Sequence, residues 1–167
     1  MANALIRIIG IDPGLRRTGW GLVGVEGSRL SYIGCGVVVA DPDAPMAERL
    51  AFIFAEVSAL VCEHAPDEAA IEETFINRDP QSALKLGQAR GVAMAALAMK
   101  GLNVAEYSAN LVKKTVVGAG HADKNQIAMM VKILLPASGA KSADAADALA
   151  VAICHAQHRA ARLRGAA

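Results

Sequence analysis

The sequence predicts an α/β fold built on a five-stranded mixed sheet with helices on both faces. Three observations carry this prediction: strand-like runs open the chain, strand-like and helix-like segments alternate after them, and the 167 residues are 54% hydrophobic and 20% charged. A single domain of this length buries about 70% of its unfolded surface. We therefore expect residues 1–167 to form one domain.

The first forty residues are predicted to form an antiparallel meander. Pro13-Gly14 and Glu26-Gly27 are turn formers that separate three apolar, strand-like runs. The expected strands are Leu5–Ile11, Thr18–Val25 and Leu30–Val39. Consecutive strands with such short connections pair with their neighbours.

The middle of the chain alternates helix and strand. Apolar residues recur at helical spacing from Pro45 to His64, and Pro66 ends that helix. A short strand, Asp67–Glu73, follows. Asp79-Pro80 joins an N-cap residue to a proline at the first helical position, so a helix is expected from there to about Met99.

The last third adds one strand and three helices. They are expected at Leu102–Tyr107, Ala109–Val117, Lys124–Leu135 and from Ala143 to about Arg162. Gly118-Ala119-Gly120 suits a flexible joint. This element order is the order of ribonuclease H-like folds, although order alone supports only an analogy.

Composition excludes several classes of protein. No apolar run approaches the roughly 18 residues of a membrane span, and the N-terminus lacks the pattern of a signal peptide, so a cytoplasmic protein without a membrane partner is expected. Cys35, Cys62 and Cys154 form no CxxC pair. We expect buried, reduced thiols rather than a disulfide framework or a zinc site.

The formal net charge of +1 hides an uneven distribution. Residues 1–77 hold five basic and eleven acidic residues, whereas residues 78–167 hold twelve basic and five acidic ones. Such asymmetry indicates a polyanionic partner. It also arises when the two halves interleave and form only a solvated surface, and charge alone does not separate these interpretations.

Two acidic residues are expected at strand ends. Asp12 precedes Pro13-Gly14, and strand alternation places it on the face of Ile8 and Gly10. A lone Asp before Pro-Gly is most often a turn former. Glu72 and Glu73 end a later strand on opposite faces, and alternation does not say which of the two faces a site.

An acidic pair opens the last helix. Asp144 and Asp147 are three residues apart, so they share a helical face. Ordinary first-turn acids that complement the helix dipole give the same pattern. The combination with the strand-end acids is more informative, because two unit charges 4 Å apart repel by about 4 kcal/mol at an effective dielectric of 20.

Bound cations would remove this repulsion. Carboxylate oxygens in this number suit Mg²⁺, with Mn²⁺ as the other choice, and two such ions in one site can activate a water and stabilise the leaving oxygen of a phosphodiester. The carboxylates therefore predict a metal-dependent nuclease. Actin-like and sugar-kinase ATPases share the Gly-x-Asp-x-Gly opening, but they need two domains, which this length does not supply.

Five motifs together resemble the RuvC family of Holliday-junction endonucleases from Ile8 to about Ile153. The most specific is the central Ala-Leu-Lys-Leu-Gly-Gln-Ala-Arg-Gly string at residues 83–91. The others are Gly10-Ile11-Asp12-Pro13-Gly14 with Thr18-Gly19, Ala70-Ile71-Glu72 with Phe75, Lys113-Lys114-Thr115-Val116-Val117-Gly118, and Ala143-Asp144-Ala145-Ala146-Asp147-Ala148.

The resemblance implies specific roles for residues. It makes Asp12, Glu72, Asp144 and Asp147 the catalytic carboxylates that bind the metal, and it selects Glu72 over Glu73. It implies that Phe75 intrudes among bases at the junction centre, so we expect this side chain to be exposed. It places Lys113 and Lys124 near the cleaved strand, with Lys114 beside them as a further DNA contact.

The resemblance also implies partners. They are a four-way DNA junction cut by symmetric nicks with a preference for thymine-rich sequence, a second copy of the chain, and the RuvA–RuvB branch-migration complex. A junction-binding module with a decayed site and a ribosomal-RNA-processing relative of the same fold remain alternatives.

The sequence itself offers one candidate dimer surface. The residues from Gly91 to Met99 are apolar on all sides of the expected helix, so a second apolar surface must cover the side away from the sheet. A second helix of the same chain could also cover it.

Overall fold

The computed structural model describes residues 4–74 and 79–165, with side chains as far as residue 161. Five strands form one sheet in the order β3-β2-β1-β4-β5. The strands β1 to β3 pair antiparallel, whereas β4 pairs parallel with both β1 and β5, so the sheet is mixed as predicted. The strands are β1 Ile6–Asp12, β2 Arg17–Glu26, β3 Arg29–Val39, β4 Glu68–Glu72 and β5 Val104–Tyr107.

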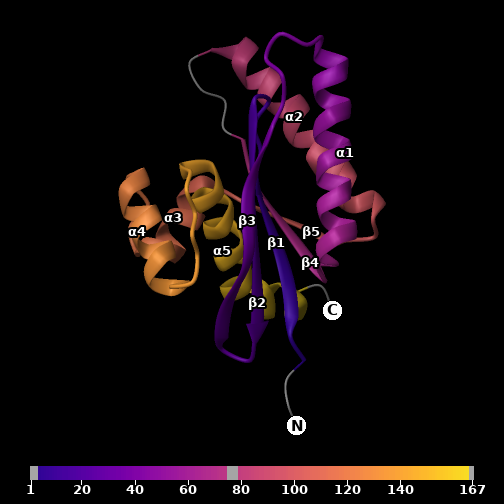
Figure 1. Ribbon diagram of the computed structural model, residues 1–167. Coiled ribbons are helices and arrows are strands. Elements are labelled where there is room, and N and C mark those ends of the chain that lie inside the picture. The colour runs from indigo at the N-terminus through magenta and orange to yellow at the C-terminus, as the bar shows by residue number, and fades with distance from the viewer. Residues whose placement is uncertain (1–3, 75–78, 166–167) are drawn as a thin grey trace.

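Helices cover both faces of this sheet (Figure 1). They are α1 Met46–His64, α2 Pro80–Met99, α3 Ala109–Val117, α4 Lys124–Leu134 and α5 Ala143–Gly165. The apolar side chains of α1 and α2 form one core on their face of the sheet, and those of α3, α4 and α5 form a second core on the other. The predicted elements are confirmed, with ends that match or differ by at most three residues.

The helix α5 is the central helix of the second face. Its residues from Ala148 to His155 are all buried, because the sheet lies on one side of the helix and α3 and α4 pack on the other. A helix that is covered all round can be apolar all round. This arrangement fixes the position of α5, and therefore of the acids at its start.

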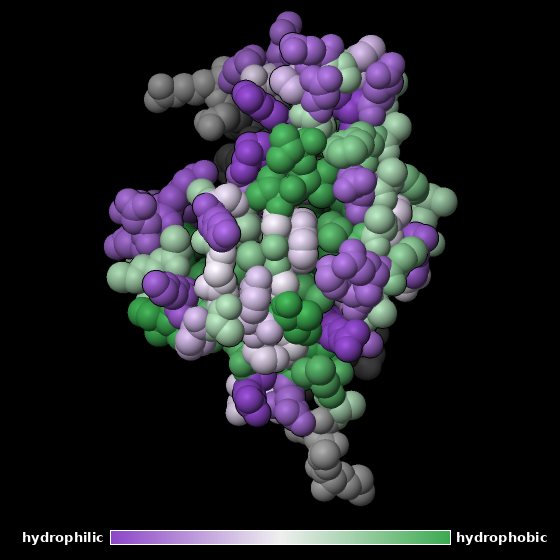
Figure 2. Space-filling view, viewed as in Figure 1, coloured by the Kyte–Doolittle hydropathy of each residue, from purple (hydrophilic) through white to green (hydrophobic). Residues whose placement is uncertain are grey.

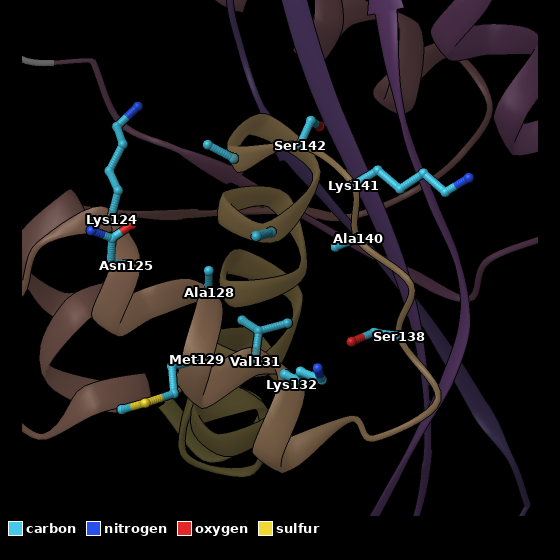
Figure 3. A pocket seen from close by; sticks show the side chains of 12 residues that line it. Lys124, Asn125, Ala128, Met129, Val131, Lys132, Ser138, Ala140, Lys141 and Ser142 are labelled. Atoms are coloured by element: carbon cyan, nitrogen blue, oxygen red, sulfur yellow. The ribbon is translucent and has the colours of Figure 1, made fainter.

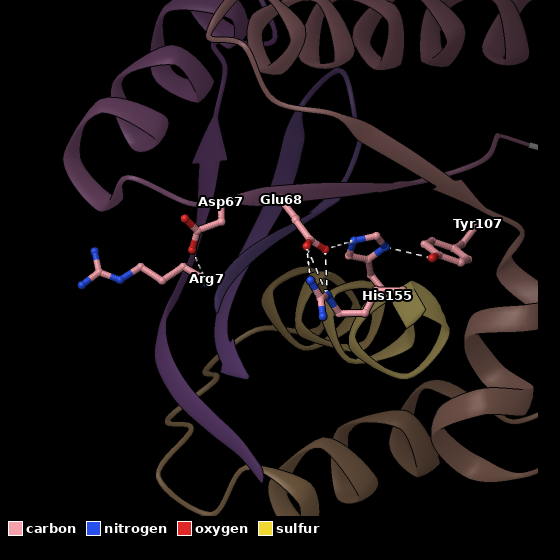
Figure 4. A network of polar contacts seen from close by, with 6 residues as sticks. Arg7, Asp67, Glu68, Tyr107 and His155 are labelled. Atoms are coloured by element: carbon pink, nitrogen blue, oxygen red, sulfur yellow. Dashed lines mark hydrogen bonds and ion pairs between the residues drawn. The ribbon is translucent and has the colours of Figure 1, made fainter. Parts of the chain in front are cut away.

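A polar network holds the far half of α5 against β4 and β5 (Figure 4). His155 Nε2 lies 2.8 Å from Glu68 Oε2, and its Nδ1 lies 2.8 Å from the Tyr107 hydroxyl. Arg159 Nε donates to both carboxylate oxygens of Glu68, and its Nη2 donates to Oε1. His158 Nε2 lies 3.0 Å from the Thr115 hydroxyl.

The thiols differ from the expectation. Cys154 is buried, but Cys35 is only half-buried and Cys62 is exposed. Cys62 follows the buried Val61 on α1, so it lies on the outer side of that helix. Within the described part of the chain, no helix has the length and apolar character needed to cross a membrane.

Candidate active site

The two strand-end acids lie side by side. Ile11 of β1 pairs with Ile71 of β4 in a parallel ladder, so the next residues, Asp12 and Glu72, leave the sheet at the same edge. Both are on the face that carries Ile8 and Ala70, whose side chains belong to the core beneath α5. Glu73 lies past the end of β4 and is exposed. The selection of Glu72 over Glu73 thus agrees with the register of the sheet.

Glycines let α5 approach the sheet at this edge. A Cβ on Gly19 would lie 2.1 Å from the carbonyl oxygen of Asp144, and a Cβ on Gly10 would lie 2.3 Å from that of Ala148. Only residues without a side chain permit such contact. Gly19 is also the register partner of Asp12, so the first turn of α5 lies directly over the β1–β2 pair at Asp12.

The start of α5 completes the cluster. The Ser142 hydroxyl accepts from the backbone N–H of Ala145, which caps the helix one residue before its first turn. Asp144 and Asp147 then share the face that approaches Asp12, and both are partly exposed. The fold therefore brings together the four carboxylates that the sequence proposes, from three separate segments.

The electrostatics of the cluster are unfavourable for four negative charges. The pKa of Asp12 is raised to about 8, mainly by burial and then by the charges of the neighbouring Glu72 and Asp147 carboxylates. Burial is also the main cause of the raised pKa of Glu72 and of Asp147. An acid that resists ionisation inside a carboxylate cluster indicates a site that lacks positive charge.

Basic side chains offset only part of this deficit. Lys124 Nζ lies 3.8 Å from Asp147 Oδ2, and Lys113 lowers the pKa values of Glu72 and Asp147 by its charge. Lys114, beside Lys113 on α3, is exposed. Lys113 and Lys124 are thus found beside the cluster, as the sequence resemblance implies.

Arg17 is a contact that the sequence reasoning missed. Its Nε donates to Asp144 Oδ2 at 2.7 Å, and the Arg17 side chain is 45% exposed. The signal that could have found it is strand alternation, because Arg17 is two residues before Gly19 and shares its face of β2. Arg17 is therefore one of the basic residues of the protein that pair with the carboxylate cluster.

The donor set fits a hard divalent cation. No group of three metal-binding side chains converges on one point among the residues that the structure describes, since Asp144 is turned toward Arg17 and Asp147 toward Lys124. The four oxygen donors are nevertheless at one edge, without histidine or thiol among them, and burial disfavours their charges. Such a set suits Mg²⁺ or Mn²⁺ rather than Zn²⁺.

Phe75 lies outside the described residues, so its predicted exposure is not tested by the structure.

An acidic cluster at one edge of this mixed sheet, with α5 laid across it, defines a metal-dependent endonuclease of the ribonuclease H-like fold. The sequence profile of the family described as "Crossover junction endodeoxyribonuclease RuvC" matches residues 8–155. The chain belongs to the RuvC family.

Relatives and solved structures agree with this assignment. The RuvC of Rhodopseudomonas palustris strain BisA53 is 65% identical over 95% of this chain and 91% of its own, and that of Azorhizobium caulinodans is 60% identical over 100% and 99%. The structure of Thermus thermophilus RuvC in complex with Holliday junction substrate is 35% identical, with a TM-score of 0.85 over 95% of this chain and 96% of its own. Yeast mitochondrial Holliday junction resolvase Ydc2, at 14% identity and a TM-score of 0.69, shares the fold.

Proposed function

We propose that this protein resolves four-way DNA junctions by metal-dependent hydrolysis of phosphodiester bonds in two equivalent strands. The observation that carries the proposal is the position of Asp12, Glu72, Asp144 and Asp147 at the same edge of the sheet. The chain also shares its fold with a RuvC that was solved on a Holliday junction. The reaction belongs to homologous recombination and DNA repair.

The four carboxylates would hold the metal, with Mg²⁺ as the proposed ion and two ions in each site. When bound, the metal supplies an activated water and neutralises charge on the leaving oxygen. Asp12 and Glu72, on the sheet, are the more buried pair of the cluster, so they provide the fixed side of the site. Asp144 and Asp147, on α5, are turned toward Arg17 and Lys124 and must exchange these cations for the metal.

The basic side chains would hold the DNA strand. Lys113 and Lys124 lie beside carboxylates that bind a cation, so they can contact phosphates on either side of the cleaved bond. Lys114 is exposed beside Lys113 and is a third candidate. Phe75 remains the proposed residue that stacks on or wedges between bases at the junction centre.

A two-fold dimer would present two such sites to two equivalent strands. The buried positions of α2 are Ala89, Ala93, Ala96 and Leu97, so one side of this helix is covered by its own chain. Ala95 is exposed, and Met99 and Leu84 are 76% and 70% exposed. This uncovered apolar side is the surface that we propose for the second copy.

The remaining proposals concern the setting of the reaction. We propose that residues 1–167 form a single nuclease domain, that it acts in the cytoplasm, and that it cooperates with the RuvA–RuvB branch-migration complex. All three rest on the family to which the chain belongs.

The test is cleavage of a mobile four-way DNA junction with and without Mg²⁺. Paired nicks that need the metal are expected, with weak cutting of linear duplex and of structured RNA. Junction binding without any cutting in Mg²⁺ or Mn²⁺ would favour the binding module, and preferred cutting of RNA would favour the RNA-processing relative.

A further inference from the structure

A pocket of about 530 Å³ lies between α4, the loop that follows it and the start of α5 (Figure 3). Its volume is within the range of small-molecule sites in proteins, about 300–1,000 Å³. The residues that line it come from three neighbouring segments, 124–132, 138–142 and 143–146. None of the four carboxylates of the cluster lines this pocket, so it calls for a separate explanation.

The charge of the pocket is of one sign. Lys124, Lys132 and Lys141 line it, and no Asp or Glu is among the described residues that do so. Figure 3 shows the three lysines around the pocket, with Lys124 and Lys132 on α4 and Lys141 on the loop opposite. Ser138 and Ser142 add hydroxyl groups, and Ser138 extends toward the space between the lysines. Three cations and two hydroxyls are the chemistry that binds a phosphate.

The floor of the pocket is apolar. Val131 and Ala146, which are 1% and 4% exposed, line its floor. Figure 2 shows hydrophilic side chains at the left of the view, with hydrophobic ones below them. A pocket with cations at its rim and an apolar floor accommodates a phosphate together with the sugar attached to it. It is larger than a lone inorganic anion needs.

The pocket is continuous with the candidate active site. Lys124 lines the pocket, and its Nζ lies 3.8 Å from Asp147 Oδ2 in the carboxylate cluster. On α5, Ala143 and Ala146 face the pocket while Asp144 and Asp147 face the cluster. Lys124 therefore joins the pocket to the carboxylate cluster.

We propose that this pocket binds one backbone phosphate of the strand being cut, held by Lys132 and Lys141 with Ser138, and that it fixes the register of that strand at the carboxylates. The proposal rests on the proposed function. It extends that function to residues that lie outside the five family motifs. Lys132 and Lys141 are positioning residues, since they act on the cleaved bond only through the strand.

The first test measures the salt dependence of binding to a four-way junction in the absence of metal. Lys132→Gln and Lys141→Gln should each lower the slope of log affinity against log salt by about 0.7–0.9, because each removes one lysine–phosphate interaction. Arg29→Gln is the matched control, because it removes the same charge from the turn between β2 and β3, at the opposite end of the sheet. Lys132 and Lys141 are exposed, so both variants should keep the melting temperature of the unmodified protein.

The second test identifies the phosphate. Neutral methylphosphonate linkages are placed one at a time along the cut strand, and binding is measured for the unmodified protein and for the Lys132→Gln/Lys141→Gln double variant. At one position near the cut, the neutral linkage should weaken binding by the unmodified protein at least about threefold and leave the double variant unchanged. The Arg29→Gln protein should respond at that position as the unmodified protein does.

Two outcomes would overturn the pocket proposal: equal slopes for the lysine variants and Arg29→Gln, or a double variant that responds to every neutral linkage as the unmodified protein does. Both outcomes leave the proposed function standing, provided that the unmodified protein still cuts the junction in Mg²⁺. Absence of cutting by the unmodified protein would instead contradict the proposed function.

Discussion

Glu68 and Glu72 are four residues apart on β4 and face the same side of the sheet, yet their surroundings shift their pKa values in opposite directions. Arg159 and His155 hydrogen-bond Glu68 and hold its pKa below the ordinary value. Burial raises the pKa of Glu72, which lies beside Asp12 and Asp147. At one end of the strand the protein supplies the counter-charge, and at the other end it supplies only part of it.

This difference separates a structural acid from a candidate catalytic one. The Glu68 network joins α5 to β4 and β5, so its interactions stabilise the fold (Figure 4). The carboxylates around Glu72 repel one another, which costs stability unless a cation is bound. The loss of stability in the metal-free protein is therefore the counterpart of a site that can bind a cation.

The largest expected effect is on cutting by variants of the carboxylate cluster. Asp12→Asn, Asp144→Asn and Asp147→Asn should each reduce junction cleavage in Mg²⁺ at least about 100-fold, because each removes a proposed metal ligand. Junction binding in EDTA should survive, since negative charge near an anionic strand has been removed. Gel-based cleavage and binding assays on the same preparations check both; near-normal cutting by any variant would remove that residue from the site.

The next effect concerns assembly. Ala95→Glu should convert a dimer into a folded monomer that no longer makes paired cuts, because Ala95 is on the exposed side of α2. Ala96→Glu is the contrasting variant: Ala96 is fully buried, so a charge there should unfold the protein. Sedimentation at micromolar concentration and melting curves distinguish the two. If the unmodified protein sediments as a monomer, the α2 interface is wrong.

A smaller effect on stability tests the comparison of the two acids. Glu68→Gln should lower the free energy of unfolding by about 2 kcal/mol, because it weakens charge-assisted hydrogen bonds from Arg159 and His155. Without metal, Glu72→Gln should raise the melting temperature, because it removes repulsion. Chemical denaturation in EDTA measures both; a loss of stability in Glu72→Gln equal to that in Glu68→Gln would contradict the distinction.

The pH dependence of stability follows from the same contrast between the carboxylate cluster, which includes Asp12, and the Glu68 network. In the folded protein the pKa of Asp12 is about 8, above its ordinary 3.8. The contribution of Asp12 to the free energy of unfolding is therefore full below about pH 3.8 and is lost as pH rises through about 8. Glu68 has the opposite sign: its contribution is present above its ordinary 4.5 and is lost as pH falls through its lowered pKa. Melting curves in EDTA from pH 4 to 9 should show a decline toward high pH that is smaller in Asp12→Asn.

Much of the fold could be predicted because its signals are local. Asp79-Pro80 marks the start of α2, and the Asp79 carboxylate accepts from the backbone N–H of Gln81 as an N-cap does. Strand alternation places Asp12 on the face of Ile8 and Gly10, where α5 packs. These patterns depend on neighbours in sequence, so they can be read without the fold.

Other features depend on contacts between distant segments. Strand alternation leaves Glu72 and Glu73 equivalent until the register with β1 is known. The Arg17–Asp144 ion pair joins residues 127 positions apart, and the Glu68–Arg159 pair joins residues 91 apart. The exposure of Cys62 depends on which side of α1 packs against the sheet. A local pattern gives the face on which a side chain such as Arg17 lies, but not the distant partner that it meets there.

The most direct measurement is junction cleavage by Glu72→Gln and Glu68→Gln side by side, in Mg²⁺, at a temperature where both are folded. Both variants remove one negative charge from the same face of the same strand. Glu68→Gln should cut at close to the unmodified rate, and Glu72→Gln should cut at least about 100 times more slowly while it still binds the junction. Equal rates for the two variants would contradict the claim that the acids at the two ends of β4 have different functions.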